Sequence, residues 1–483
     1  MKNNKVWMSL FGAALATSIT VIGCGSSGGG TFAGGGGTGT GGSGSGASGG
    51  SGTGTASVGL NGGSVTGSGG QNTGTSGTGT STGGTSGTSG GTGTTTAGNT
   101  TGGFLGPVED AGQVASLNQP TQMVRVGSRI YFVDGFGLAN NGRLMYTTVD
   151  ANNNFTTPVQ ITGATGSPVS SVLVNPWGLV SDGTNLYISV GFNSPQEAGI
   201  LRVSNINATA NTATFTELTG AATFMDNPAF MLLANVDGGQ YIYWSEYSSV
   251  NSSGRVRRTL ASGNGQGAIQ DVVNNLNFPA GLATDGNNLV ICDNAGGGTS
   301  LGRLVRVPLS FSNTNTTNAD NATQITPIAS QVSDPIVRPF DVAYDGLNGF
   351  FITEGNAINY PGSTTTLPQP NTQGGGRVRY LPRTATTATV VATGLSNTAG
   401  IDVAQLTNGS VGVLFSESIV STGRVLRIVV DPTNVAVQTP SVVDTGLFSP
   451  IDVAIVDSAR PLFLALVNYD GGQSNGLLNA YAP

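Results

Sequence analysis

Histidine is absent from all 483 residues, and its absence excludes several kinds of chemistry. Without an imidazole the chain has no His-based acid–base pair, no Ser-His-Asp or Cys-His triad and no His-ligated metal. Lysine occurs only at Lys2 and Lys5, so the rest of the chain cannot form a Schiff base. Charged residues make up 9% of the sequence and the formal net charge is −7, which argues against a nucleic-acid partner.

Glycine is abundant but unevenly placed. Of the 78 Gly, 35 lie in residues 25–103 together with 19 Thr and 13 Ser, and this tract holds no charged residue. Such a segment has almost no apolar surface to bury, so nothing offsets the entropy of ordering it. The composition therefore predicts a disordered linker over residues 24–103 and a folded region over residues 104–483.

The N-terminal residues have the pattern of an export signal. Lys2 and Lys5 precede a largely apolar run from Val6 to Ile22, which is too short for a confident membrane-spanning helix. The two cysteines are Cys24, at the end of this run, and Cys292, about 270 residues further on, so a disulfide between them is not expected. Residues 1–23 are predicted to be a signal peptide.

The sequence Val21-Ile22-Gly23-Cys24 resembles the lipobox of bacterial lipoproteins. The resemblance implies that Cys24 is diacylated and becomes the mature N-terminus, with the linker as a tether to a membrane. No Asp follows Cys24, which by the same resemblance implies sorting to the outer membrane or cell surface. The alternative is an ordinary cleaved signal in which the Cys occurs by chance.

Residues 104–483 contain seven internal repeats with a mean spacing near 55 residues. Each repeat begins with turn residues and an apolar strand, continues through a turn into a second strand, and opens a third strand with a glycine. The opening segments are Gln119-Pro120, Asn175-Pro176, Asn227-Pro228, Phe278-Pro279, Arg338-Pro339, Gly400-Ile401 and Ser449-Pro450, and the glycines are Gly142, Gly199, Gly254, Gly302, Gly376, Gly423 and Gly476.

A fourth strand follows in most repeats, but the last repeat ends at Tyr481-Ala482-Pro483 without one. A segment of similar character, Gly106–Gly112, precedes the first repeat. A ring that is closed by this N-terminal strand leaves no open sheet edge at the junction. We therefore expect an all-β fold, a seven-bladed β-propeller, and no segment has sustained helical periodicity.

The repeats resemble those of the NHL-repeat propellers, whose unit reads Pro-x-Gly-Val-Ala, Asp-Gly, Leu-Tyr-Val-x-Asp and Arg-Val. The closest agreement is Pro279–Ala283, Asp285-Gly286, Leu289–Asp293 and Gly302–Leu304. The resemblance covers about 380 residues and implies the fold, but propellers serve as binding modules, scaffolds and enzymes alike.

Five second strands end in an acid, and in the same five repeats an Arg follows the third-strand glycine. The pairs are Asp134 and Arg143, Glu246 and Arg255, Asp293 and Arg303, Glu354 and Arg377, and Glu417 and Arg424. The other two repeats carry neither residue. Because acid and Arg are present or absent together, the pattern predicts cross-strand ion pairs in preference to a ring of cation ligands.

A second set of carboxylates, Asp341, Asp402 and Asp452, occupies the third position of Pro-x-Asp-Val-Ala-like segments in successive repeats. No Arg varies with them. Oxygen ligands without His or Cys suit Ca²⁺ or Mg²⁺, so one interpretation is a cation site at a mouth of the central channel. The other is that each Asp caps backbone amides of a neighbouring blade. The long connection from Gly355 to Gly376 belongs to the same end of the expected ring and is either functional or a tolerated insertion.

Two functions fit this inventory. One is a membrane-tethered, monomeric binding or scaffolding module for a protein or polysaccharide of the envelope or cell exterior. The other is a divalent-metal-dependent, lactonase-like hydrolase, by analogy with gluconolactonase-like propellers, with Asp341, Asp402 and Asp452 as its carboxylates. A streptogramin-lyase reaction is not expected, because the His that those propellers require has no counterpart.

Overall fold

The computed structural model describes Phe104 and most of residues 109–482. Residues 1–103, 105–108 and 483 lie outside the described part, as do the connections 136–141, 150–154, 165–172, 192–197, 220–224, 248–253, 264–268, 295–301, 311–316, 320–321, 328–335, 356–375, 419–421, 456–462 and 468–475. No helix in the described part is long and apolar enough to span a membrane.

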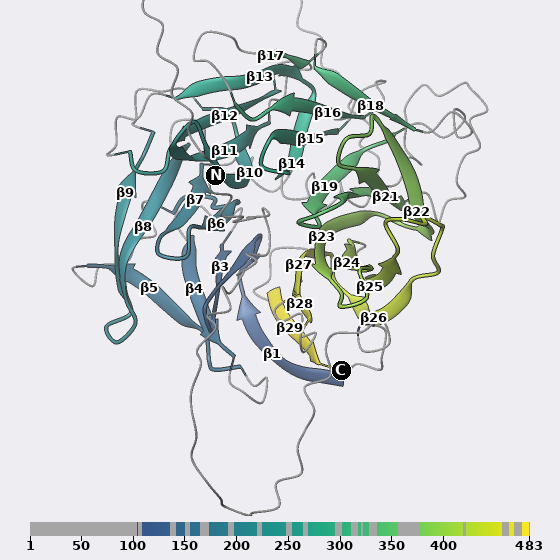
Figure 1. Cartoon of the computed structure of the whole chain (residues 1–483). Coiled ribbons are helices and arrows are strands. Elements are labelled where there is room, and N and C mark those ends of the chain that lie inside the picture. The colour runs from purple at the N-terminus through teal and green to yellow at the C-terminus, as the bar shows by residue number, and fades with distance from the viewer. Residues whose placement is uncertain are drawn as a thin grey trace, which may run out of the picture.

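The chain forms an all-β, propeller-like arrangement of four-stranded sheets around a common centre (Figure 1). Each sheet takes the name of its first strand in the chain. The β2 sheet contains β2 (Met123–Val126), β3 (Arg129–Asp134), β4 (Arg143–Thr148) and β5 (Val159–Gly163). The β6 sheet contains β6 (Leu179–Ser181), β7 (Leu186–Val190), β8 (Gly199–Asn207) and β9 (Thr212–Glu217). The β10 sheet contains β10 (Pro228–Val236), β11 (Gly239–Glu246), β12 (Gly254–Leu260) and β13 (Gln270–Leu276).

The following sheets repeat this order. The β14 sheet contains β14 (Phe278–Thr284), β15 (Asn288–Asn294), β16 (Arg303–Pro308) and β18 (Thr323–Pro327). The short β17 (Thr317–Asn318) precedes β18 in the chain but pairs with β13 of the β10 sheet. The β19 sheet contains β19 (Pro339–Tyr344), β20 (Gly349–Glu354), β21 (Gly376–Pro382) and β22 (Thr387–Leu395). The β23 sheet contains β23 (Thr398–Gln405), β24 (Val411–Glu417), β25 (Gly423–Val430) and β26 (Ser441–Leu447).

The last sheet, the β27 sheet, is built from both ends of the folded region. It contains β27 (Pro450–Ile455), β28 (Phe463–Val467), β29 (Gly476–Ala482) and the N-terminal strand β1 (Glu109–Leu117). β1 pairs antiparallel with β29, from Glu109 opposite Ala482 to Leu117 opposite Gly476, and the two strands lie side by side in Figure 1. The N-terminal strand predicted at 106–112 thus pairs as expected but runs from 109 to 117.

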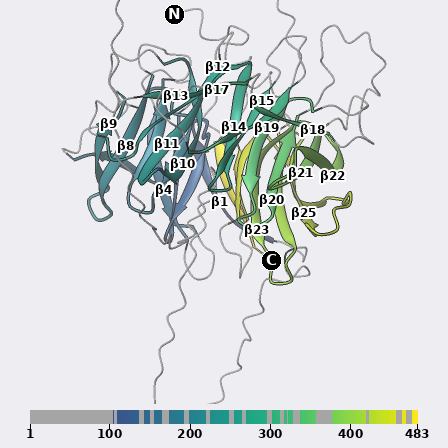
Figure 2. The same ribbon diagram turned by 45° about the horizontal axis from the view of Figure 1, so that its top comes forward.

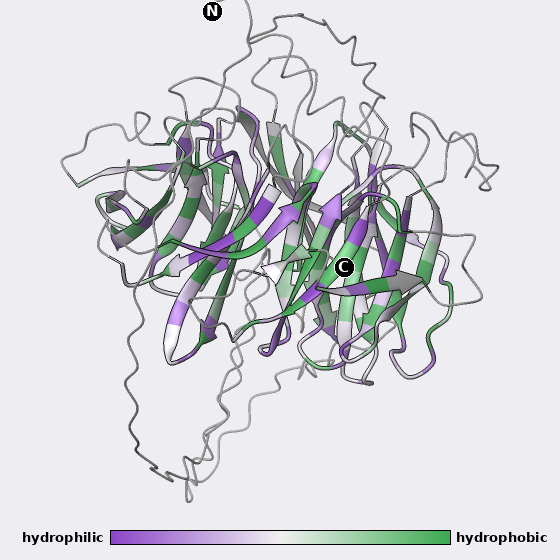
Figure 3. Cartoon of the chain, turned by 90° about the horizontal axis from the view of Figure 1, so that it is seen from above, coloured by the Kyte–Doolittle hydropathy of each residue, from purple (hydrophilic) through white to green (hydrophobic). Residues whose placement is uncertain are grey.

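Neighbouring sheets also meet at their outer strands. β5 pairs in parallel with β9, β13 with β17, and β18 with β22. β18 pairs with β16 and completes the β14 sheet, where no fourth strand was predicted. Viewed from two further directions, the strands run through the thickness of the disc, with apolar residues along their length (Figures 2 and 3).

Aromatic side chains from different sheets meet in the core. The ring centroids of Trp177 and Phe230 are 6.3 Å apart, and those of Phe230 and Phe340 are 5.4 Å apart, both in edge-to-face geometry. Trp177 lies just before β6, Phe230 lies in β10 and Phe340 lies in β19. All three side chains are buried. They belong to one apolar cluster with Met123 and Ile451, which joins the inner strands around the ring.

The glycine before or at the start of the third strand allows one sheet to approach the next. A Cβ on Gly254 would lie 2.6 Å from Cδ of Pro279, and one on Gly302 would lie 2.5 Å from Cδ of Pro339. The same relation closes the ring, because a Cβ on Gly476 would lie 2.5 Å from Cδ of Pro120. The repeated Gly and Pro therefore form contacts between consecutive sheets, and a side chain at the Gly would push them apart.

Candidate functional site

The five acids that end second strands face the Arg of the same sheet. The strand registers place Asp134 opposite Arg143, Glu246 opposite Arg255, Asp293 opposite Arg303, Glu354 opposite Arg377 and Glu417 opposite Arg424. Arg255 Nε lies 2.7 Å from Glu246 Oε2 and Arg303 Nε lies 2.8 Å from Asp293 Oδ2. Arg143 and Arg424 form ion pairs with Asp134 and Glu417 in the same way.

Glu354 is the exception in detail. Arg377 Nη1 is 4.0 Å from its carboxylate, whereas Nε of the fully buried Arg379, two residues further along β21, is 2.6 Å away. Arg379 is thus the closer ion-pair partner of Glu354, and the sequence pattern did not identify it. Burial, together with the charge of Arg379, lowers the pKa of Arg377 to about 10.

These acids have a second task, which is to accept backbone N–H groups from the loop that enters their own sheet. Asp293 Oδ1 accepts from Asn277 at 2.7 Å and from Phe278 at 2.9 Å. Glu354 accepts from Val337, and Glu417 accepts from Ser396. Desolvation by burial still raises the pKa of Asp134, Asp293 and Glu354, although their Arg partners oppose that shift. The carboxylates therefore have a structural role, because they hold both an Arg side chain and the backbone of the entering loop.

Asp341, Asp402 and Asp452 lie on the innermost strands β19, β23 and β27 and are at most 4% exposed. In each, Oδ1 accepts the N–H of the next residue, at 2.8 to 3.0 Å. Oδ2 reaches the following sheet: Asp341 accepts from Ile401 at 3.3 Å, Asp402 from Ile455 at 2.8 Å and Asp452 from Met123 at 3.0 Å. The capping interpretation describes these contacts.

The three Asp residues do not occupy one register position. Asp341 lies inside the irregularity between Pro339 and Val342, whereas Asp402 pairs with Leu414 and Asp452 pairs with Leu466. A bulge in the inner strand frees backbone amides from the ladder, and a short carboxylate can accept them without leaving its own strand. The sequence motif aligned the three residues, but the bulges offset them along the ring axis.

Burial dominates the electrostatics of this group. It raises the pKa of Asp402 to about 8 and that of Asp452 to about 7. It also raises the pKa of Asp341 well above its usual range, and the charge of Asp452 adds to that shift. The hydrogen bonds that each carboxylate accepts from backbone amides lower its pKa, but they do not cancel the effect of desolvation.

Within the described residues, no group of three or more His, Cys, Asp or Glu side chains is arranged to hold a metal ion. Each Asp carboxylate accepts a backbone amide at both of its oxygens. Asp341, Asp402 and Asp452 are therefore inter-sheet caps in this structure.

The sequence missed the other side chains that perform this task. Gln122 Oε1 accepts the N–H of Leu179 at 3.1 Å, so that β2 is joined to β6 as β27 is joined to β2. Ser189 and Thr353 instead donate from the second strand to the next sheet, to the carbonyls of Ala229 and Ala399 at 2.9 and 2.6 Å. Gln122 stands at the motif position of the Asp residues, which was a usable signal.

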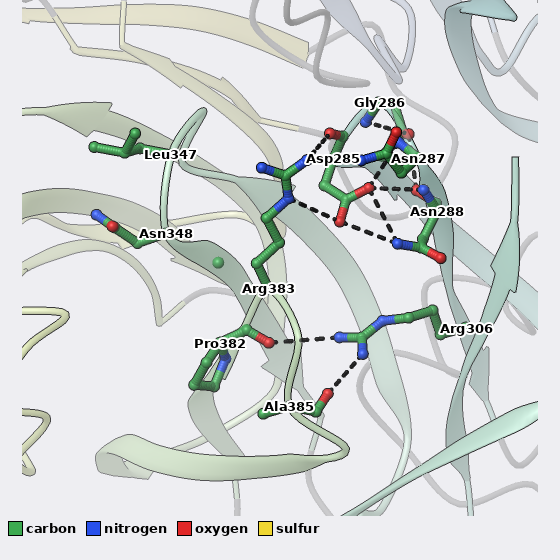
Figure 4. A network of polar contacts seen from close by, with 12 residues as sticks. Asp285, Gly286, Asn287, Asn288, Arg306, Leu347, Asn348, Pro382, Arg383 and Ala385 are labelled. Carbon is green, nitrogen blue, oxygen red and sulfur yellow. Dashed lines mark hydrogen bonds and ion pairs between the residues drawn. The ribbon is translucent and has the colours of Figure 1, made fainter.

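A polar network at the turns joins the β14 and β19 sheets (Figure 4). Asp285 Oδ1 accepts the N–H groups of Asn287 and Asn288, and Arg383 Nε lies 3.1 Å from Asp285 Oδ2. In return, Arg306 of the β14 sheet donates to the carbonyl of Ala385 at 2.7 Å. The Asp-Gly turn expected from the repeat is thus also an inter-sheet contact.

Two expected features fall outside the described residues. Cys24, with the signal peptide and the linker, is one, and the long connection is the other, since 356–375 is not described. Cys292 is described and lies fully buried in β15, where burial raises the pKa of its thiol well above the usual value.

Comparison with known proteins finds structural similarity at low sequence identity only. No family model matches the sequence, and no curated protein matches it significantly. Among solved structures, a puromycin-hydrolysing peptidase of Mycobacterium tuberculosis aligns with a TM-score of 0.45 and 9% identity over 73% of this chain and 49% of that chain, so the match spans about half of the peptidase.

Two further matches are propeller domains. The Dos1 propeller aligns with a TM-score of 0.42 and 11% identity over 75% of this chain and 78% of its own. The β-propeller domain of the Trilobed protease from Pyrococcus furiosus, described as having an open velcro topology, aligns with a TM-score of 0.40 and 8% identity over 76% of this chain and 94% of that chain. The propeller-like description of this chain rests on its own sheet arrangement, and similarity at this level says nothing about activity.

Proposed function

We propose that the folded region is a closed ring of seven blades that serves as a membrane-tethered binding or scaffolding module. Each four-stranded sheet corresponds to one blade, and the pairing of β1 with β29 supports closure of the ring by the N-terminal strand. The partner is a protein or polysaccharide of the envelope or cell exterior, and the module acts as a monomer without nucleic acid. The fold is that of an NHL-like propeller in an exported lipoprotein.

The observation that carries this proposal is that the buried acids form contacts within and between the sheets. Asp341, Asp402 and Asp452 hold backbone amides of adjacent sheets, and the second-strand acids hold Arg side chains and loop amides. Polar groups employed in this way stiffen a ring and support its connecting loops. A stiff frame with variable loops is how many scaffolds present a binding surface.

The tether forms the second part of the proposal. Residues 1–23 act as a lipoprotein signal, Cys24 carries the lipid, and residues 25–103 hold the ring away from an outer-membrane or cell surface. Replacing Cys24 by Ser should move the protein from the membrane fraction to the soluble fraction and abolish incorporation of labelled palmitate. Membrane association that survives C24S would contradict the lipid anchor but leave the binding function open.

A divalent-metal-dependent, lactonase-like hydrolase using Ca²⁺ or Mg²⁺ is the second candidate. It is favoured by one observation: Asp341, Asp402 and Asp452 are buried carboxyls on the innermost strands of three consecutive sheets, and the charge of Asp452 raises the pKa of Asp341. Since their oxygens accept backbone amides, such a site would need ligands beyond Asp341, Asp402 and Asp452.

One set of assays separates the two candidates. The purified chain is titrated against envelope polysaccharide and solubilised envelope protein, and is incubated with dihydrocoumarin and p-nitrophenyl acetate, each with Ca²⁺, Mg²⁺ or EDTA. Saturable binding without turnover is the expected result. Metal-dependent turnover that is lost in Asp402→Asn, while the fold is kept, would overturn the binding proposal in favour of the hydrolase.

A further inference from the structure

Phe104 enters the ring ahead of the closing strand and inserts into a different sheet from the one that β1 completes. Its side chain is fully buried and packs in a cluster with Leu414 and Val425 of the β23 sheet. The same cluster contains Val453 of β27 and Tyr481 of β29. Phe104 therefore lies at the junction between the β23 and β27 sheets, directly after the Gly-rich tract that ends at residue 103.

A glycine on β24 makes room for this ring. A Cβ on Gly412 would lie 2.6 Å from Cε2 of Phe104 and 2.7 Å from Cδ2, closer than any ordinary van der Waals contact. The φ of Gly412 is not among the positive values in the described chain, so the backbone itself does not require glycine there. The contact with Phe104 is what excludes a side chain at this position.

The carbonyl of Phe104 repeats a contact found elsewhere in the ring. Arg202 of β8 donates to the carbonyl of Ala261 at 3.4 Å, and Arg306 of β16 donates to that of Ala385 at 2.7 Å. In both, a third-strand Arg reaches the turn between the third and fourth strands of the next sheet. Arg427 of β25 donates in the same way to the carbonyl of Phe104 at 2.6 Å.

The β27 sheet cannot supply that turn, because its third strand β29 ends at Ala482 and its fourth strand β1 comes from the other end of the folded region. Phe104 stands in its place, five residues before β1 begins at Glu109. From these contacts we infer that Phe104 is a lock for ring closure: it fixes the start of the closing segment to the β23 sheet, so that displacement of residues 1–103 does not peel β1 from β29.

The lock predicts a local effect that hydrogen exchange can measure on the full chain. In Phe104→Ala, backbone amides of β1 and β29 should exchange at least about tenfold faster than in the unsubstituted protein, because the closing segment opens without global unfolding. Amides of β15, on a distant sheet, should be unchanged. The matched control is Phe448→Ala, since Phe448 is 37% exposed after β26, and it should leave β1 and β29 unchanged.

A second variant keeps the inference testable if Phe104→Ala unfolds the chain. Gly412→Ala places a methyl group against the ring of Phe104 and should speed exchange in β1 and β29. In the double variant Phe104→Ala with Gly412→Ala the methyl enters the emptied space, so its added effect should disappear. Exchange in β1 that stays at the unsubstituted rate in both single variants, or additive effects in the double variant, would overturn the lock.

Discussion

Oδ2 of Asp452 accepts the backbone N–H of Met123 at 3.0 Å, and this contact joins residues 329 positions apart in the sequence. Asp452 belongs to the sheet that the two ends of the folded region build together, and Met123 begins the sheet next to it. Its Oδ1 accepts the N–H of Val453 at 3.0 Å. A single carboxylate thus caps a bulge in its own strand and links the last sheet to the β2 sheet.

Removing this carboxylate should cost more than removing the single-amide cap at the next junction. Asp452→Ala leaves two buried N–H groups without their acceptor, and each orphaned amide costs about 1–3 kcal/mol. Gln122→Ala leaves one, the N–H of Leu179. The loss in unfolding free energy, measured by urea denaturation, should be clearly larger for Asp452→Ala. Equal losses would mean that the second amide of Asp452 contributes nothing.

The same carboxyls should make stability depend on pH. Burial raises the pKa of Asp402 to about 8 and of Asp452 to about 7, so the folded chain binds protons that the unfolded chain releases above about pH 4. The stabilising contribution of these groups is therefore full at acidic pH and falls as pH rises from about 4 to 8.

Asp402→Asn isolates this effect, because the amide does not titrate. The unsubstituted chain should lose stability between pH 5 and pH 8 through Asp402, and the variant should not. The unfolding free energy of the variant minus that of the unsubstituted chain should therefore increase over this range. Thermal and urea denaturation at both values provide the measurement. A difference that is constant with pH, or that changes in the opposite direction, would show that the buried carboxyl does not carry the shifted proton.

Glu354 offers a test of which Arg matters. Arg379 is fully buried with its Nε 2.6 Å from the carboxylate, whereas Arg377 is 4.0 Å away. Arg379→Ala leaves a buried carboxylate with only the longer contact to Arg377 and should cost about 3–5 kcal/mol, and Arg377→Ala should cost about 1 kcal/mol or less. The reverse order in chemical denaturation would return the principal role to Arg377, which the sequence pattern had favoured.

The pairing of acid and Arg could be predicted from the sequence, but the choice of Arg partner at Glu354 could not. The joint presence of an acid and an Arg at fixed repeat positions was enough to predict their pairing, because antiparallel register is regular at those positions. The pattern could not identify Arg379, since its reach depends on side-chain direction within the sheet. It also could not show whether Asp341, Asp402 and Asp452 converge, because bulges of one residue shift them along the strands and carboxylates suit amides and cations equally well.

Phe104 was missed for a different reason. It stands alone beside a glycine tract and has no counterpart in the repeats, so neither periodicity nor motif spacing could mark it. Its role depends on the β29 and β25 strands, which are more than 300 residues away in the sequence and are brought to it by closure of the ring. The expected strand at 106–112 was close in position but could not define how the segment enters the fold.

The third-strand glycines provide a steric test with a control at the equivalent position. A Cβ on Gly302 would lie 2.5 Å from Cδ of Pro339 and 2.7 Å from the backbone N of Arg338, whereas the nearest atom to a Cβ on Gly199 is 3.5 Å away. Gly302→Ala should therefore lower the unfolding free energy by about 1–3 kcal/mol by separating the β14 and β19 sheets. Gly199→Ala should change it by less than about 0.5 kcal/mol. If both substitutions cost the same, the repeated contact between glycine and proline does not set the distance between sheets.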